Sequence, residues 1–345
     1  MPSLPERIDN TEQLDEILTR PTPELVSWAR ELDGDILVLG VGGKMGPSLA
    51  ELALRASREA GVERQVIGVS RFSEPRTEAA LRAKGIHTIR ADLLNADDLA
   101  RLPDVLNVVF MAGRKFGTTG NQALTWAMNV FMPGLVAERF KNARIVAFST
   151  GNVYPLVPLS SGGATEETPP QPVGEYAQST LGRERIFEHF SRVNKTPVTL
   201  IRLNYAIDLR YGVLLDVAQR VYEGQPISLA MPAANVIWQG DANAYVLRSF
   251  AMCSSPPAVL NVTGPETVSI RWLANKFGEL FGREPVLVDE EQPTAYLSNA
   301  SRCFERFGYP QVPLLTMVNW VAHWVKTGQP TLAKPTHFEE RAGNY

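Results

Sequence analysis

The chain has 345 residues, of which 44% are hydrophobic, and its formal net charge is −3. This length and apolar content suit one large α/β domain, or a nucleotide-binding domain with a smaller lobe. The charge provides no electrostatic attraction for nucleic acid or for an anionic membrane surface. We therefore expect a small-molecule substrate, and neither a nucleic-acid nor a membrane partner.

The cysteines and histidines indicate no metal site. Cys253 and Cys303 lie far apart, and the four histidines have neither an i,i+4 pair nor a cysteine partner. Two free thiols suit a reducing compartment, so we expect a cytoplasmic protein. No signal peptide is evident, and the uncharged stretch 312–325 is too short to cross a bilayer. Its apolar residues follow a helical period and predict a packed helix.

Residues 1–34 predict a helical extension that packs on the core. Thr11 is a candidate cap for a short helix to about Thr19, and Thr22 followed by Pro23 predicts the start of a second helix. We read no chemistry in this segment.

The stretch 35–46 organises the rest of the chain. Its apolar residues predict a buried parallel strand, glycines follow at 40, 42, 43 and 46, and the next apolar residues have helical spacing. In such a unit Gly40 permits the tight turn, Gly43 lets the backbone approach a pyrophosphate, and Gly46 lets the helix pack on the strand. The helix N-terminus adds free N–H groups. We predict a dinucleotide site that includes Gly40, Gly42, Gly43, Lys44, Met45 and Gly46.

The end of the second strand, 65–69, bears on the choice of cofactor. In dinucleotide folds an acidic residue at this place holds the ribose hydroxyls, whereas here Ser70 and Arg71 follow the strand. An arginine and a small hydroxyl suit a 2′-phosphate, so NADP is favoured over NAD. The alternative is that Arg71 is only a solvated loop residue.

Two further strands end in candidate ligand-binding residues. A third strand, 86–90, leads to Asp92 and Leu93, and a fourth, 105–110, opens into the loop 111–120. Ligands bind at the carboxyl ends of strands in open α/β sheets. In that loop Ala112 and Gly113, next to Met111, would allow a cofactor to approach. Arg114 and Lys115 face either an anionic group or the solvent.

The remaining elements complete the predicted fold. We expect a long helix over about 121–140, a fifth strand over 143–148, a helix from Tyr176 to about Val193, and a sixth strand over 197–204. Residues 155–175 are rich in Pro, Gly, Ser and Thr and predict a loop on the substrate side. Strands alternating with helices indicate a Rossmann-type, doubly wound parallel sheet.

The pattern loosens beyond the sixth strand. We expect helices at about 213–223, from Asp241, and at about 270–281, with a strand at 259–262. The predicted organisation is a helical extension (1–34), a dinucleotide-binding domain (35–205), a smaller, mixed substrate-binding lobe whose chain returns to the core (206–327), and a polar tail lying over the surface (328–345).

These motifs resemble the extended short-chain dehydrogenase/reductase family, usually called NAD-dependent epimerase/dehydratases. Gly40, Gly43 and Gly46 match its G-x-x-G-x-x-G pattern. Residues 149–154 resemble its Ser/Thr stretch ending in Val-Tyr-Gly, with Pro155 in place of the last glycine. Residues 166–169 resemble its acidic stretch before the active tyrosine. With matches at 261–266 and 307–310, the similarity covers roughly residues 35–325.

The resemblance implies roles for individual residues. Tyr176 falls on the catalytic tyrosine, Thr150 on the catalytic hydroxyl, Asp92 on the aspartate that contacts adenine, and Asn129 on the asparagine of the central helix. The implied cofactor site then also takes in Leu93, Met111, Ala112, Gly113, Ser149, Tyr176 and Thr180. The implied substrate residues are Arg114, Asn152, Asn204 and Arg210.

One part of the active-site signature is absent. The family has Tyr-x-x-x-Lys, whereas this chain has Thr180 in the lysine position. An ammonium ~4–5 Å from the phenol would contribute on the order of 3 kcal/mol, or about two pKa units, at an effective dielectric near 20. Thr180 cannot supply that field. Lys115 is our candidate for a replacement, together with the positive charge of an oxidised nicotinamide.

Two classes of function follow. The first is an enzyme that transfers hydride to or from a sugar or sugar-like alcohol, as an epimerase or dehydratase or, alternatively, as an NADP-dependent dehydrogenase. The second is a non-catalytic dinucleotide-binding sensor, favoured by the absent lysine. A nucleotide sugar remains one substrate class, although Leu203 to Ala206 depart from the family's substrate segment and no diphosphate clamp is readable. The resemblance also implies a homodimer formed through helices 121–140 and 176–193.

Overall fold

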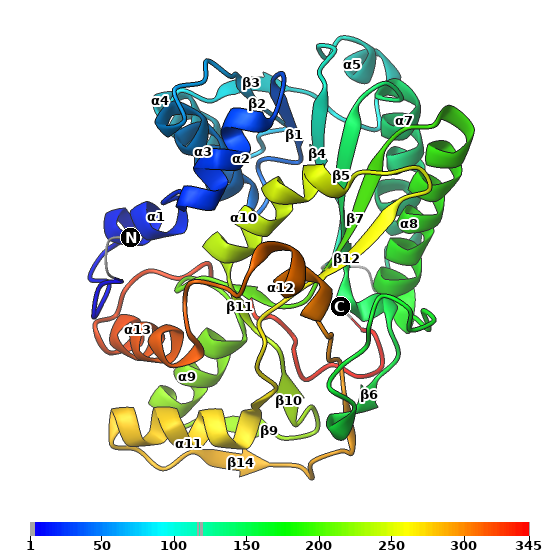
Figure 1. The fold of residues 1–345 in the computed structure, drawn as a ribbon. Coiled ribbons are helices and arrows are strands. Elements are labelled where there is room, and N and C mark those ends of the chain that lie inside the picture. Colours follow the sequence, from blue (N-terminus) through cyan, green and yellow to red (C-terminus); the bar gives the residue numbers. More distant parts are fainter. Residues whose placement is uncertain (1–3, 116, 118–119, 345) are drawn as a thin grey trace.

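The computed structural model describes residues 4–115, 117 and 120–344 (Figure 1). Three positions of the predicted loop 111–120, namely 116, 118 and 119, therefore lie outside the described residues, as do residues 1–3 and 345 of the two terminal segments. Among the described residues, no helix combines the length and the apolar character that crossing a bilayer requires.

A seven-stranded parallel sheet forms the centre of the molecule, which confirms the predicted doubly wound fold. Its spatial order is β12-β7-β5-β4-β1-β2-β3. Because β1 lies between β2 and β4, the chain reverses its direction across the sheet at β1 and β4, and ligands bind at such a switch point. The strands are β1 (Ile36–Leu39), β2 (Val66–Ser70), β3 (His87–Arg90), β4 (Asn107–Phe110), β5 (Arg144–Thr150), β7 (Val198–Leu203) and β12 (Ala258–Val262).

Helices cover both faces of this sheet. One hydrophobic core joins the sheet to α2 (Pro23–Glu31), α3 (Gly46–Glu59) and α10 (Gln239–Arg248). A second core, on the other face, joins it to α5 (Ala96–Ala100), α7 (Met132–Arg139) and α8 (Gly174–Asn194). All residues of β1 and β4 are buried, as expected for strands covered on both sides. The sheet is flanked further by α4 (Pro75–Ala83) and α12 (Ser301–Phe307).

A lobe built around its own core lies beside the sheet (Figure 1). Its helices are α1 (Thr11–Leu18), α9 (Val213–Glu223), α11 (Ile270–Phe281) and α13 (Leu314–Lys326). Four two-stranded pieces stiffen it: β6 (Val157–Pro158) with β15 (Thr294–Ala295), β8 (Ala206–Ile207) with β11 (Ile237–Trp238), β9 (Pro226–Ser228) with β14 (Val286–Val288), and β10 (Ala233–Ala234) with β13 (Val268–Ser269). Short 3₁₀ turns cover Gly151–Val153, Leu159–Ser161 and Ser249–Met252.

The predicted single helix over 121–140 is interrupted. It consists of α6 (Gln122–Trp126), a π-helical turn (Ala127–Phe131) and α7. The Met132 N–H donates to the carbonyl of Ala127, five residues back. Pro133 has no N–H with which to continue the α-helical pattern, and the wider turn accommodates this loss. At the first helix Asn10, rather than Thr11, is the cap, because its side chain accepts the N–H of Gln13.

The segment 328–345, predicted to be a polar tail lying over the surface, is largely exposed over its described residues but is anchored in the lobe by a few buried residues. Phe338 is fully buried in the core of the lobe, and Thr336 is only 1% exposed. The polar composition of the segment concealed this single aromatic anchor, whose burial removes a large apolar surface from water. The tail therefore belongs to the folded body of the protein.

Candidate active site

A cavity of about 1160 Å³ opens at the carboxyl ends of the central strands. It is lined by many of the residues predicted for cofactor binding, catalysis and substrate binding, although these come from distant parts of the sequence. The predicted cofactor residues that line it are Gly40, Gly42, Gly43, Lys44, Met45, Ser70, Met111, Gly113, Ser149 and Tyr176. The other predicted residues that line it are Lys115, Thr150, Asn152, Asn204 and Arg210.

Several predicted cofactor residues do not line this cavity. Arg71 is exposed, and the Asp92 carboxylate accepts the N–H of Leu94 at 3.0 Å. Asn129 is buried and clamps the backbone of Arg114, accepting its N–H at 2.8 Å and donating to its carbonyl at 2.9 Å. Gly46 serves packing, since a Cβ there would lie 2.2 Å from the Val41 carbonyl oxygen. Leu93, Ala112, Arg114 and Thr180 are also outside the lining, as are all residues from 155 to 175.

The glycine loop fits the pyrophosphate of a dinucleotide. α3 begins directly after the loop, its first turn holds no acidic residue, and its N-cap Met45 makes no side-chain capping hydrogen bond. The N–H groups of such an uncapped helix end attract an anion. A Cβ on Gly43 would meet only the Gly40 carbonyl oxygen, at 3.4 Å, so the loop surface is open there.

Tyr176 and Thr150 lie together in the cavity. Burial raises the pKa of Tyr176, whereas hydrogen bonds with the hydroxyls of Thr150 and Thr180 and the charge of Arg183 lower it. Asn152 orients Thr150: the Thr150 hydroxyl donates to its side-chain oxygen at 3.1 Å, and its N–H donates to Thr150 Oγ1 at 3.2 Å. The site therefore joins a half-buried phenol to a fixed hydroxyl.

Arg183 supplies a positive charge near the position of the absent lysine. It follows Thr180 by about one helical turn, and it donates to the Phe148 carbonyl at 2.9 Å and to the Asn129 side chain at 2.8 Å. Burial lowers its pKa to about 10, so it stays charged at neutral pH. Sequence reasoning missed this residue, although a cation one turn beyond Thr180 on the same helix is a readable signal.

Lys115 lies against the same phenol. Its ammonium is 5.9 Å from the centre of the Tyr176 ring and 3.4 Å from the Thr336 carbonyl oxygen, to which it donates. Burial lowers the pKa of Lys115 to about 8, while the charge of Asp216 acts in the opposite direction. The ammonium thus lies beside the Tyr176 ring, and the catalytic role expected for Lys115 stays a prediction.

Lys44 reaches from the glycine loop to the segment after β7. Its ammonium donates to the Ala206 carbonyl at 2.7 Å and lies 4.2 Å from the centre of the Tyr211 ring. Burial lowers its pKa to about 8. Among the described residues, no carboxylate lies within ion-pair distance of this ammonium.

A buried ion pair lies behind Ser149, which lines the cavity at the end of β5. Arg202 on β7 donates two hydrogen bonds to the Glu184 carboxylate on α8, at 2.7 and 2.9 Å. The Ser149 hydroxyl donates to the same carboxylate, and Tyr154 accepts a further hydrogen bond from Arg202 at 2.8 Å. Both charged side chains are almost fully buried. This network fixes the end of β5, which carries Thr150.

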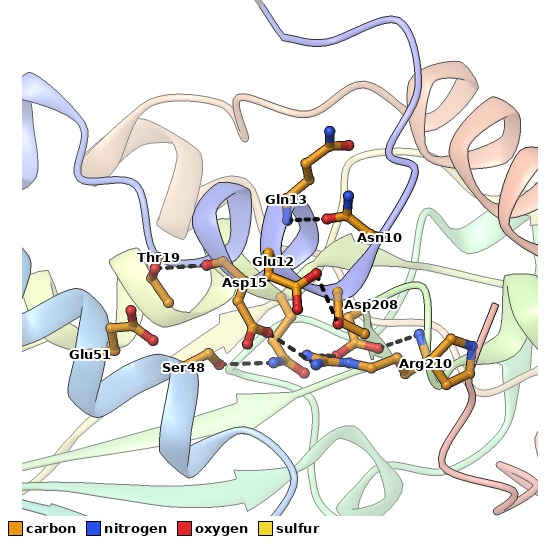
Figure 2. A network of polar contacts seen from close by, with 12 residues as sticks. Asn10, Glu12, Gln13, Asp15, Thr19, Ser48, Glu51, Asp208 and Arg210 are labelled. Atoms are coloured by element: carbon orange, nitrogen blue, oxygen red, sulfur yellow. Dashed lines mark hydrogen bonds and ion pairs between the residues drawn. The ribbon is translucent and has the colours of Figure 1, made fainter. Parts of the chain in front are cut away.

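Arg210 is neutralised by two carboxylates. It pairs with Asp208 at 3.2 Å and with Asp15 of α1 at 3.0 Å, in the network that Figure 2 shows.

Among the described residues, no group of three or more His, Cys, Asp and Glu side chains is placed to hold a metal ion.

Solved structures with this fold include several sugar-modifying enzymes. The dTDP-glucose 4,6-dehydratase DesIV of Streptomyces venezuelae, solved with NAD and TYD, aligns with a TM-score of 0.71 at 18% identity, over 85% of this chain and 97% of that one. The UDP-glucuronic acid 4-epimerase of Bacillus cereus, solved with UDP-glucuronic acid and NAD, gives 0.70 at 18% identity, over 85% and 99%. Pal of Bacillus thuringiensis gives 0.69 at 17% identity, over 85% and 99%.

The similarity to these solved structures establishes the fold, and the match to a family profile establishes the family to which the chain belongs. A search of curated proteins found no match. The profile of the NAD dependent epimerase/dehydratase family, however, matches residues 36–231, from the first strand of the sheet into the lobe. The chain belongs to the NAD dependent epimerase/dehydratase family.

Proposed function

We propose that the protein is a nicotinamide-dinucleotide-dependent enzyme that acts by hydride transfer at a hydroxyl-bearing carbon of a sugar or sugar-like alcohol. The observation that carries this proposal is that one cavity holds the glycine loop, Thr150 and Tyr176. The neighbours' NAD and nucleotide-sugar ligands support the same class of chemistry.

The residues of the chain divide the work between binding and proton transfer. The glycine loop and the N-terminus of α3 would hold the pyrophosphate of the dinucleotide, which when bound supplies the hydride acceptor. Tyr176 takes the proton of the substrate hydroxyl, and Thr150 forms a hydrogen bond with the same oxygen. Arg183 and Lys115 stabilise the phenolate, in place of the lysine that Thr180 replaces.

NADP is our preferred cofactor, with NAD as the alternative. Ser70, Ser73 and Arg76 line the cavity next to the end of β2 and offer hydroxyls and a guanidinium to a 2′-phosphate. Arg76 takes the role that the sequence assigned to Arg71. The neighbours' ligands are NAD, which makes the comparison of NADP and NAD affinities the direct test.

We also propose a homodimer that forms through α6, α7 and α8. These helices share an apolar surface on which Phe131 is 59% and Trp126 is 39% exposed. Two copies of one apolar patch can cover each other around a two-fold axis. Light scattering should give a dimer for the native protein and a monomer for Phe131→Asp.

The free thiols Cys253 and Cys303 suit a cytoplasmic location.

A single substitution separates an enzyme from a sensor. Tyr176→Phe removes the proton acceptor and keeps the ring, so we expect it to abolish the appearance of reduced nicotinamide or of sugar product while dinucleotide affinity stays the same. The matched control is Tyr309→Phe, which makes the same change at an exposed tyrosine. Equal turnover of Tyr176→Phe and the native protein would refute the catalytic role.

A further inference from the structure

Two terminal segments converge on the cavity. The Bacillus cereus epimerase is matched over 99% of its chain, whereas 15% of this chain's 345 residues, or about 52, stay unmatched. Segments 1–34 and 328–345 have this combined length. Asp15 and Thr19 of the first and Leu332, Lys334 and Thr336 of the second line the cavity. They form what we call the terminal wall.

Ion pairs hold the N-terminal part of the terminal wall in place. Asp15 pairs with Arg210, and Figure 2 shows the two side chains facing each other between α1 and the segment after β8. Thr19 accepts a hydrogen bond from Arg55 of α3 at 2.7 Å. These contacts fix α1 against the helix that follows the glycine loop.

The C-terminal part of the terminal wall is anchored along its length. Its Leu332 N–H donates to the carbonyl of Arg210 at 2.9 Å, so both terminal segments meet at that residue. The Asp216 carboxylate accepts both the N–H and the hydroxyl of Thr336, at 2.8 and 2.6 Å. Further along, Phe338 is buried, and Arg341 donates to the Thr294 carbonyl at 2.7 Å.

The terminal wall limits the size of the substrate. The cavity of about 1160 Å³ extends from Ser70 and α4 to Tyr176 and therefore includes much of the predicted dinucleotide site. Pockets for one drug-sized ligand have about 300–1,000 Å³. Residues of the terminal wall take up part of the rim of this cavity, and we infer that they leave room beside a dinucleotide for a small molecule rather than for a nucleotide sugar.

The charge of the cavity favours an anionic substrate. Arg210 is matched by Asp208 and Asp15, whereas the half-buried Lys44 contacts the Ala206 carbonyl and the Tyr211 ring and forms no ion pair with a described carboxylate. Lys115 lines the same cavity, close enough for its charge to act on Lys44. The charges of Asp208 and Asp216 already act on these ammonium groups, and an anionic substrate group would add to that compensation.

We propose that the substrate is a small polyol with one anionic group, a carboxylate or a phosphate, which Lys44 and Lys115 bind while a hydroxyl lies at Tyr176 and Thr150, and that the terminal wall excludes nucleotide sugars. This inference rests on the proposed hydride-transfer function. It assigns to this chain a substrate class different from the nucleotide sugars of the structural neighbours.

Ligand-observed NMR on the full chain, saturated with NADP or NAD, tests the proposal. The probes are a panel of C4–C7 aldonates including gluconate, glucose 6-phosphate, neutral glucose and UDP-glucose. We expect an aldonate or the sugar phosphate to bind at least tenfold more tightly than glucose, and UDP-glucose not to bind. The proposal fails if UDP-glucose binds, if glucose binds as well as the anions, or if no anion of the panel binds.

Lys44→Met locates the anion. Removal of a charged hydrogen-bond donor should weaken the aldonate or phosphate tenfold or more and the dinucleotide much less, because the Lys44 ammonium reaches away from the glycine loop to the Ala206 carbonyl. Lys276→Met, on the surface of α11 and paired with Glu279, is the matched control. If Lys44→Met instead weakens the dinucleotide and leaves the small anion unaffected, Lys44 serves the cofactor pyrophosphate and the assignment is wrong. Absence of dinucleotide binding by the native protein would refute the proposed function separately.

Discussion

The buried ion pair between Glu184 and Arg202 offers a quantitative test of the structure. The two side chains are 3% and 6% exposed, and Arg202 donates to both carboxylate oxygens. Glu184→Gln keeps the shape and one acceptor oxygen but removes the charge. Arg202 would then remain buried with no opposing carboxylate.

Removing one partner of a buried pair costs about 3–5 kcal/mol, because the other charge stays desolvated without compensation. Glutamine retains one hydrogen bond to Arg202, so we expect about 3 kcal/mol. That is a large part of the 5–15 kcal/mol by which folded proteins are typically stable. The double variant Glu184→Met with Arg202→Met removes both charges, and it should be less destabilised than Glu184→Gln.

Urea unfolding followed by circular dichroism measures these free energies. Glu188→Gln is the matched control, since it lies one turn further along α8 and pairs with Arg185 and Arg192 at the surface. Such an exposed pair contributes about 0–1 kcal/mol. If Glu184→Gln lost no more stability than Glu188→Gln, the burial and pairing of Glu184 and Arg202 described here would be wrong.

Three further results are expected. Gly46→Ala should destabilise the fold, since the new Cβ would lie 2.2 Å from the Val41 carbonyl oxygen. Gly43→Ala should keep the stability of the fold, because a Cβ there has space, but it should weaken dinucleotide binding in equilibrium titrations. Lys115→Ala should raise the Tyr176-dependent pKa in the pH profile of kcat/KM, because the Lys115 ammonium lies 5.9 Å from the centre of the Tyr176 ring and its positive charge favours the phenolate. An unchanged profile and cofactor affinity would remove Lys115 from the mechanism. Burial lowers the pKa of Lys44 in the folded state to about 8 from 10.5, so the unfolded chain binds more protons and stability rises with pH above 8. This rise should be smaller in Lys44→Met, as urea titrations at several pH values would show.

The sheet and the glycine loop were readable from the sequence because each rests on local patterns. Apolar runs such as 36–39 and the glycine spacing after them specify buried parallel strands and the turn that follows, whatever the distant contacts are. The match of Thr150 and Tyr176 to family motifs brought them to one site, and the structure places both in one cavity.

Features that depend on distant contacts were not readable. Phe338 is one aromatic residue in a polar tail, and only its partners in the lobe core explain its burial. The meeting of Asp15 and Leu332 at Arg210 joins the two ends of the chain, which no local spacing indicates. Arg183 was missed because its relation to Tyr176 is a matter of three-dimensional placement on α8.

The central claim is that the glycine loop binds a nicotinamide dinucleotide. The most direct test is to denature the purified protein and identify released nucleotides by mass spectrometry, then to titrate the emptied, refolded protein or a nucleotide-free preparation with NADP and NAD. We predict either stoichiometric release of one of them, as in a cofactor kept through a cycle of hydride removal and return, or reversible binding of NADP or NAD, as in a dehydrogenase. A protein that releases no nucleotide and binds neither would contradict the account.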